Sequence, residues 1–251
     1  MGIYLGTTKL DVMPDIGKSP LSGEEISCVL SGIHAKNNLI YPDTQTWTLT
    51  SDGIIPTNYK DNDSNQLHGY AVNLQVTAIP KDLSSIFEEL NYLHYINLTS
   101  LNTSKVESMK NMFASCGVAT LDVSHFDTSR VTNMSSMFEY CKQLTTLDVS
   151  HFNTSRVTDM SSMFDYCEQL TTLDVSHFNT SQVTNMSRMF YYCRNLKLLD
   201  LSSFDTSAVT NMEMMFDNCD NLKTVYCRTQ ADADKLKTAS AAPATINFVV
   251  K

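Results

Sequence analysis

The sequence has 251 residues, of which 42% are hydrophobic, and a formal net charge of -9 at pH 7. A chain of this size can bury a sizeable core, and no apolar run approaches the roughly 18 residues that a membrane-spanning helix needs. We therefore expect no membrane insertion. The negative net charge disfavours a surface that binds nucleic-acid phosphates, so we expect no nucleic-acid partner.

Residues 1–69 show no internal repeat and predict a small β-rich segment. Trp47 and Leu49 alternate with threonines in TQTWTLT, which is typical of a strand, and a Ser-Asp-Gly turn follows. The stretch PLSGEEISCVLSGI favours one short helix beginning after Ser22. The polar residues at 58–66 indicate a loop or linker.

Five copies of one unit fill the middle of the chain. A cysteine recurs at steps of 25, 26, 26 and 26 residues, and a phenylalanine three positions before it keeps the same step. The segment at 70–95 fits a degenerate sixth unit that caps the array. The cysteines are Cys116, Cys141, Cys167, Cys193 and Cys219, and the units span 96–120, 121–146, 147–172, 173–198 and 199–224.

Each unit begins with the spacing of a short strand. In the third unit Leu147 and Val149 alternate with Asp148 and Ser150, so the polar pair should point away from the core. A turn follows, in which a threonine can satisfy the backbone through side-chain hydrogen bonds. The threonines of this turn are Thr128, Thr154, Thr180 and Thr206.

The apolar period then changes to that of a helix. Thr158 is the expected N-cap of a two-turn helix in the third unit. Stacked units would place their strands about 4.8 Å apart and merge the helical stripes into one core. The stripe at i, i+3, i+4 and i+7 consists of Met160, Met163, Phe164 and Cys167.

These lines resemble a known family. The L-x-x-L-x-L strand, the FxTSxVTxM turn and the MSxMFxxC line are similar to the BspA-type leucine-rich repeats of bacterial surface proteins, over about 96–227. The resemblance implies an α/β repeat fold, a right-handed leucine-rich-repeat solenoid with one short strand and one short helix per coil. It also implies a secreted or surface-displayed bacterial protein that binds host matrix, mucin or glycan, or neighbouring cells. One departure is that Phe126, Phe152, Phe178 and Phe204 replace the usual buried Asn or Cys after the strand.

The last segment, 225–251, should cap the open end of the core. TQADADKLKTAS predicts a helix that begins after Thr229, and TINFVV predicts a final strand after Pro243. Together they would shield the apolar side of the last unit.

The cysteines favour a buried column of reduced thiols, because five of them occupy one recurring slot. Neighbouring helices normally stand 8 to 10 Å apart, which is too far for disulfides. Cys219 and Cys227 are the one pair that could be bridged. No C-x-x-C occurs, so we expect no zinc site, and we expect no cofactor.

The repeated histidines do not indicate a catalytic site. Catalysis needs one differentiated nucleophile, base and orienting group, whereas these groups recur identically in successive units. We therefore expect no enzyme; a hydrolase would need a site within 1–69, where no motif links His34 and His68. The repeated histidines, expected to cover the corner between strand and turn, are His125, His151 and His177.

The exposed strand surface is the candidate ligand face. Its carboxylates, about 4.8 Å apart, repel by roughly 1 kcal/mol per neighbouring pair even in water. A regular ladder of acceptors would suit a repetitive partner, such as a glycan chain or a basic protein segment, with or without a bridging cation. The alternative is a merely solvated sheet. The candidate residues are Asp122, Asp148, Asp174, Asp200, Ser124, Ser150, Ser176, Thr146 and Thr172.

A binding module at the cell surface or outside the cell is thus the function that the sequence favours. MGIYLGTTKLDVM lacks the basic start and apolar stretch of a signal peptide, so we expect a removed leader or another export route. The alternative is a phage or prophage tail-associated protein that recognises the bacterial surface, because IYLGTTKLDVMPDIG is loosely similar to the starts of virion tail proteins. A trimer formed through 1–69 would favour it, but the sequence does not predict the oligomeric state.

Overall fold

The computed structural model describes residues 81–251, except residues 90, 92, 100 and 241, and the backbone of five strands before them. Side chains are described from residue 81 on, outside most of strand β6. The elements are β1 (Ile3–Leu5), β2 (Thr8–Leu10), β3 (Ile26–Lys36), β4 (Leu39–Leu49), β5 (Tyr70–Val76), β6 (Leu93–Asn97), β7 (Thr120–Leu121), β8 (Thr146–Leu147), β9 (Leu198–Leu201), β10 (Thr224–Cys227), α1 (Gln230–Ala239) and β11 (Asn247–Val250).

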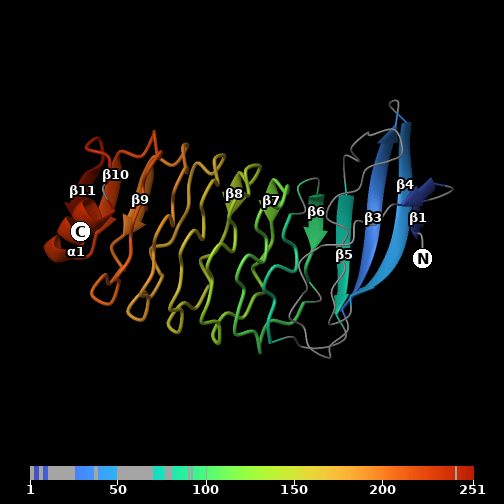
Figure 1. Cartoon of the computed structure of the whole chain (residues 1–251), viewed down its shortest axis with the longest axis horizontal. Helices are drawn as coiled ribbons and strands as arrows, with labels where there is room; N and C mark the ends of the chain where they lie inside the picture. Colours follow the sequence, from blue (N-terminus) through green and yellow to red (C-terminus); the bar gives the residue numbers. More distant parts are fainter. Residues whose placement is uncertain are drawn as a thin grey trace.

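The first strands form sheets at one end of the molecule (Figure 1). Strands β1 and β2 pair antiparallel, and a four-stranded sheet has the order β4-β3-β5-β6. Strand β3 pairs with β4 along its full length, beginning with Ile26 opposite Leu49. The prediction of a short helix after Ser22 is wrong from residue 26 on, because this stretch bonds to partner strands on both sides. Trp47 lies in β4, and the loop expected at 58–66 lies outside the described residues.

Beyond this sheet the chain winds in successive coils that lie side by side in a row (Figure 1). The N–H of Thr158 donates to the carbonyl of Thr132 at 2.8 Å, and Thr184 donates to Thr158 at 2.9 Å, one coil further. Because each coil bonds to the next through its backbone, the repeated unit is a stacking unit. A row of single parallel bridges runs through Asp82, Ser108, Asn133, Asp159, Asn185 and Asn211.

The segment expected as a degenerate unit, 70–95, makes the same kind of contacts. Its strand β5 pairs in parallel with β6, which runs from the end of this segment into the next unit. Further along, Leu83 donates its N–H to Ser108 at 3.0 Å, and Phe87 donates to Met112 at 2.9 Å. The row of coils therefore begins in this segment.

The apolar stripe at 160–167 is not a helix, and the same correction applies to every repeat. Alternate N–H groups cross to the neighbouring coil, as from Ser162 to the carbonyl of Ser187 at 2.8 Å. A helix would direct each N–H to the carbonyl four residues earlier, so these crossing bonds exclude it. Ser162 and Tyr166 have φ of 54° and 56°, in the left-handed region, which bends this segment into consecutive turns. Helix α1 is the one helix among the described residues.

The expected N-cap, Thr158, has a different role. The turn begins instead at Asp159, whose Oδ1 accepts the N–H of Ser161 at 2.9 Å, and Asn133 does the same one coil earlier. The hydroxyl of Thr158 donates to the carbonyl of Thr132 at 3.1 Å. This threonine therefore links two coils rather than capping a helix.

The core is a column of stacked rings and thiols. Phe164 is fully buried and stacks on Phe138 and Phe190, with ring centroids 5.7 and 5.8 Å apart. The thiol of Cys167 donates to the carbonyl of Phe138 at 3.2 Å, and equivalent bonds recur in the neighbouring coils. Burial raises the pKa of the Cys116 thiol to about 12. The prediction of a buried thiol column is confirmed: Cys116, Cys141, Cys167, Cys193 and Cys219 are buried and free, and so is Cys227, which lies outside the column. The spacing of helices expected to keep these thiols apart does not apply, because the repeats bond as turns from coil to coil.

The turn threonines form a second, polar column inside the molecule. The hydroxyl of Thr154 donates to the carbonyl of Asn179 at 3.0 Å and accepts the N–H of the same residue at 2.8 Å. Thr128 and Asn153 repeat this pair of bonds one coil earlier. The prediction that these threonines satisfy the turn backbone is confirmed, and their partners lie in the adjacent coil.

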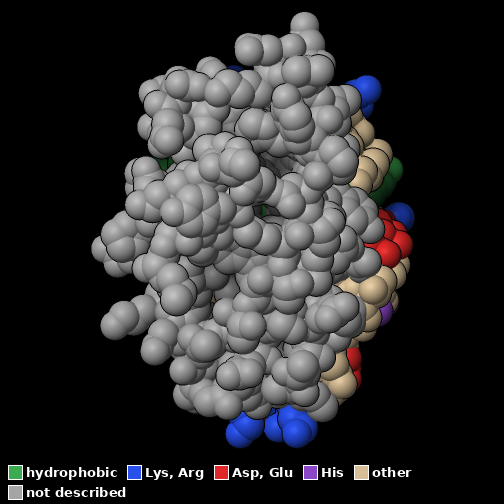
Figure 2. All heavy atoms as spheres, turned by 90° about the vertical axis from the view of Figure 1, so that its right-hand side faces the viewer, with side chains coloured by type: hydrophobic (Ala, Val, Ile, Leu, Met, Phe, Trp, Pro, Cys, Tyr) green, Lys and Arg blue, Asp and Glu red, His purple; other side chains and the backbone are tan. Residues whose placement is uncertain are grey.

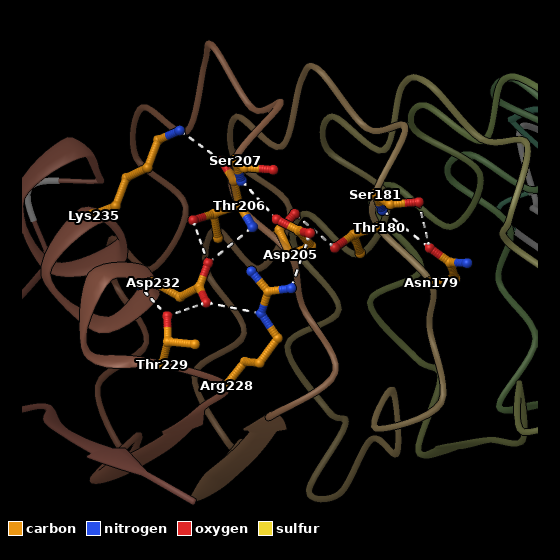
Figure 3. Close-up of polar contacts among 10 residues, drawn as sticks. All are labelled: Asn179, Thr180, Ser181, Asp205, Thr206, Ser207, Arg228, Thr229, Asp232 and Lys235. Atoms are coloured by element: carbon orange, nitrogen blue, oxygen red, sulfur yellow. Dashed lines mark hydrogen bonds and ion pairs between the residues drawn. The ribbon is translucent and has the colours of Figure 1, made fainter.

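Helix α1 and strand β11 cover the last coil (Figure 1). Thr229, the residue expected to precede the helix, is its N-cap. Phe248 of β11 places its ring 5.9 Å from that of Phe216. Figure 3 shows how Asp232 turns back toward Thr206: its Oδ1 accepts the backbone N–H at 3.0 Å and the hydroxyl at 2.7 Å. In the last coil, the Asp232 carboxylate thus accepts the hydroxyl bond that the other turn threonines donate to a carbonyl of the next coil.

Candidate functional site

The strand side of the coils carries a groove of about 880 Å³. It extends over four coils, from Thr120 to Asp200, and coincides with most of the predicted ligand face. Ser124 and Ser150 do not line it. Seven predicted residues do: Asp122, Asp148, Asp174, Asp200, Thr146, Thr172 and Ser176.

The groove lies where the row of strands is interrupted. Strands β7 and β8 pair with each other, and β9 pairs with β10, but residues 171–175 form no strand. No backbone bond joins 171–175 to 145–149 or 197–201, all of which the structure describes. The expected continuous strand pairing is therefore wrong at this coil, and the gap forms part of the floor of the groove.

The carboxylates of the groove are held in one orientation. Oδ1 of Asp122 accepts the N–H of Ser124 at 3.0 Å and its hydroxyl at 2.7 Å, and Asp174 makes the same pair of bonds with Ser176. These hydroxyl bonds, and then the N–H bonds, lower the pKa of both carboxyls, as they do for Asp148. The serines thus position the carboxylates and keep them ionised.

The fourth carboxylate, Asp200, already holds a cation. The Lys251 ammonium donates to its Oδ2 at 2.6 Å and lies 4.7 Å from the centre of the Tyr226 ring. Burial raises the pKa of Asp200, but the bonds from Lys251 and Ser202 outweigh burial and leave this pKa lowered. Sequence reasoning missed this pair because 51 residues separate its members.

The histidines beside the groove join coils together. Nε2 of His151 lies 2.7 Å from the carbonyl of Val123, and His177 makes the same contact with Val149 at 2.8 Å. Because a carbonyl can only accept, Nε2 carries the hydrogen. The rings thus cover the corner between strand and turn, as predicted.

Among residues 81–251, apart from the undescribed positions, no group of three or more His, Cys, Asp or Glu side chains is arranged to hold a metal ion. In the same part of the chain, no helix is long and apolar enough to cross a membrane. Figure 2, which views the molecule from the end that carries β1 to β4, shows both acidic and basic side chains along one edge of the described surface.

The tyrosines beside the cysteine column pack on one another. The rings of Tyr140 and Tyr166 stack 4.4 Å apart, and those of Tyr166 and Tyr192 stack 4.3 Å apart. Lys142 lies 5.0 Å from the centre of the Tyr166 ring, and Arg194 lies 4.6 Å from that of Tyr192. Both faces of the Tyr166 ring are therefore covered, whereas Tyr140 stays 38% exposed.

Asp165 is a buried carboxylate that sequence reasoning missed. Its side chain is 0% exposed, Oδ2 accepts Nε of Arg188 at 3.0 Å, and Oδ1 has no hydrogen-bond partner. Burial raises the pKa of Asp165 to about 6, although Arg188 acts in the opposite direction. An acid recurs at the equivalent position in Glu139 and Asp217, but not in Tyr191, and neither of these two acids is fully buried. The repeat therefore gives no signal for the burial of Asp165.

Asp165 should make stability depend on pH. Its pKa lies near 6 when folded and near 3.8 when unfolded, so the folded state binds a proton more readily between these values. The free energy of unfolding should therefore rise as pH falls from 7 to 4, by up to about 3 kcal/mol relative to Asp165→Asn. Urea unfolding of both proteins across this range measures the difference. A difference that does not change with pH would contradict the prediction.

A family model described as "Mycoplasma protein of unknown function, DUF285" matches residues 81–195 and 145–235. Together the matches cover more than half of the chain. The chain belongs to the DUF285 family. The DUF285 matches begin in the first described turn and end within α1, so they contain the whole groove. No curated protein and no solved structure matches the chain.

Proposed function

We propose that this DUF285 chain is a non-catalytic binding module of the BspA-like leucine-rich-repeat type, with the right-handed solenoid of that class. In this proposal the protein is displayed on or secreted from a bacterial cell. Its groove recognises host matrix, mucin or another glycan, or a neighbouring cell. The lines quoted from the repeats support the class, and the backbone bonds between coils support a solenoid.

The groove is the observation that carries the binding role. Its ionised carboxylates are oriented by serines, recur from coil to coil, and face an open volume of about 880 Å³. Such a surface can bind an extended partner at several points at once. A catalytic role has less support, because the groove repeats identical groups rather than one differentiated set.

Binding of the labelled chain to immobilised matrix proteins, to mucin and to intact bacterial cells tests this proposal. Matrix or mucin binding that is lost in the Asp148→Ala/Asp174→Ala variant would support recognition through the groove. Matrix binding that the variant retains would exclude the groove. Binding to bacterial cells alone would favour the tail-associated alternative over a host-directed adhesin.

A further inference from the structure

The turn that follows the strand repeats one tripeptide. Asn-Thr-Ser stands at this turn in three coils, and Asn-x-Ser/Thr is the motif at which asparagine is N-glycosylated. Two other coils begin the same turn with Asp127 or Asp205, which have no amide nitrogen. None of these residues lines the groove, so the motif is not explained by the binding role. The three copies occupy 102–104, 153–155 and 179–181.

The asparagine side chains in two neighbouring copies are exposed and held in one orientation. Oδ1 of Asn153 accepts the N–H of Ser155 at 3.1 Å and its hydroxyl at 2.7 Å. Asn179 makes the same two bonds with Ser181, at 3.1 and 2.8 Å (Figure 3). In the part of the chain that the structure describes, no residue bonds to Nδ2 of either asparagine. The amide oxygens are therefore occupied, and the amide nitrogens are left free.

This geometry favours attack by the amide nitrogen. The lone pair of an amide nitrogen is normally delocalised toward the oxygen, which makes the nitrogen a weak nucleophile. Two donors at Oδ1 stabilise the negative charge that collects on the oxygen when Nδ2 gives up a proton to a base of the transferring enzyme. Nδ2 can then attack C1 of a hexose carried on a nucleoside diphosphate. The bond between Nδ2 and C1 forms, the bond between C1 and the phosphate oxygen breaks, and the nucleoside diphosphate leaves with the bonding electrons.

Two further motifs of the same kind differ in their position in the fold. Asn133 and Asn185 each begin Asn-Met-Ser, and their Oδ1 atoms accept the same two bonds from serine. Both asparagines lie in the row of parallel bridges that joins the coils, and both are only partly exposed. A bulky donor and its enzyme reach such a position less readily than an exposed turn. The fold thus separates two pairs of motifs that are otherwise matched.

We propose that Asn153 and Asn179 are N-glycosylation sites, at which an enzyme adds a hexose from a nucleoside diphosphate donor to the folded chain. Thr154 supports this order of events, because its hydroxyl donates to the carbonyl of Asn179 and accepts the N–H of Asn179. These bonds fix the turn only once the coils have stacked. A water-soluble donor can reach a chain that has already folded. The sugars would stand side by side on one flank of the coils, outside the groove.

Hexose transfer to the full, folded chain tests the inference, with a soluble N-glycosyltransferase as enzyme and UDP-glucose as donor. Fragmentation mass spectrometry measures the initial rate at each asparagine, relative to a free peptide of the same local sequence. All four motifs end in serine, so the enzyme's preference between serine and threonine does not bias the comparison. Asn153 and Asn179 should react at about the rate of their peptides. Asn133 and Asn185 should react about tenfold more slowly than theirs, because their coils must first open locally.

Ser155 supplies the matched control. Ser155→Ala removes the hydroxyl bond, so the rate at Asn153 should fall about a hundredfold, the usual loss when one donor to a developing oxyanion is removed. Ser155→Thr should retain the rate, and Asn179 in the same chain should not respond to either change. No reaction at Asn153 and Asn179 in the folded chain, or equal relative rates at all four asparagines, would overturn the inference. Because none of these residues lines the groove, either failure leaves the proposed function standing.

Discussion

Replacement of Asp232 by alanine should lower the free energy of unfolding by about 2 to 4 kcal/mol, since buried polar groups that lose their hydrogen-bond partner cost about 1 to 3 kcal/mol each. Asp232 is only 3% exposed. It accepts the N–H and hydroxyl of Thr206, the hydroxyl of Thr229, and Nε of Arg228 at 3.0 Å (Figure 3). Alanine would leave the buried polar groups of Thr206 without a partner. Urea unfolding followed by circular dichroism measures the loss.

Asp234 supplies the matched control, because it lies in the same helix but is exposed, where its Oδ1 accepts from Gln230. Asp234→Ala should change the free energy of unfolding by less than about 0.5 kcal/mol. A similar small change for Asp232→Ala would show that the last threonine of the column does not need its carboxylate.

Asp232 also makes the free energy of unfolding depend on pH. Burial raises the pKa of Asp232, but the bonds from Thr229, Thr206 and Arg228 outweigh burial and bring it to about 2. A pKa lowered from 3.8 means that the stabilisation is complete above about pH 4 and is lost as pH falls toward 2. Over that range the unfolding curves of the unchanged chain and of Asp232→Ala should converge.

Phe164→Ala should cost about 3 to 5 kcal/mol, because it removes a fully buried ring from the middle of a stack. The ring lies 5.7 Å from Phe138 and 5.8 Å from Phe190, so a cavity would open between two coils. Phe164→Leu, which fills most of this space, should cost clearly less. The ratio of the two losses, from urea unfolding at pH 7, checks the packing. Equal losses for the two variants would contradict this account, because they would mean that refilling the cavity recovers no stability.

The stacking unit could be predicted from the sequence because its signals recur. One coil alone leaves the role of Phe164 or Thr154 ambiguous, but five copies in register indicate columns. The polar threonine column and the buried thiols follow from repetition together with side-chain chemistry. The cap was also predictable, because Thr229 precedes a polar segment with helical composition and a final apolar stretch.

The helix in each repeat could not be rejected from its spacing. Apolar residues at i, i+3 and i+4 serve a helix and a run of consecutive turns equally well. Helix and turns are distinguished by the acceptors of alternate N–H groups. The N–H of Ser162 donates to the carbonyl of Ser187, in another coil. No pattern within one unit contains that information.

The candidate face was predictable in its residues but not in its shape. Alternation identified Asp148 and Asp174 as outward-facing. That the backbone at 171–175 separates from both neighbours, and that Lys251 occupies Asp200, depends on contacts between distant parts of the chain. The burial of Asp165 was not predictable, because acids at the equivalent positions 139 and 217 are only partly buried and the burial depends on the coils on either side.

The most direct test of the central claim compares two variants of equal charge for binding to the matrix protein or mucin that captures the unchanged chain. Asp148→Asn/Asp174→Asn should weaken binding by about tenfold, while Asp127→Asn/Asp159→Asn should leave it unchanged. Surface plasmon resonance at one salt concentration is sufficient. If the two variants bind alike, the groove is not the ligand face.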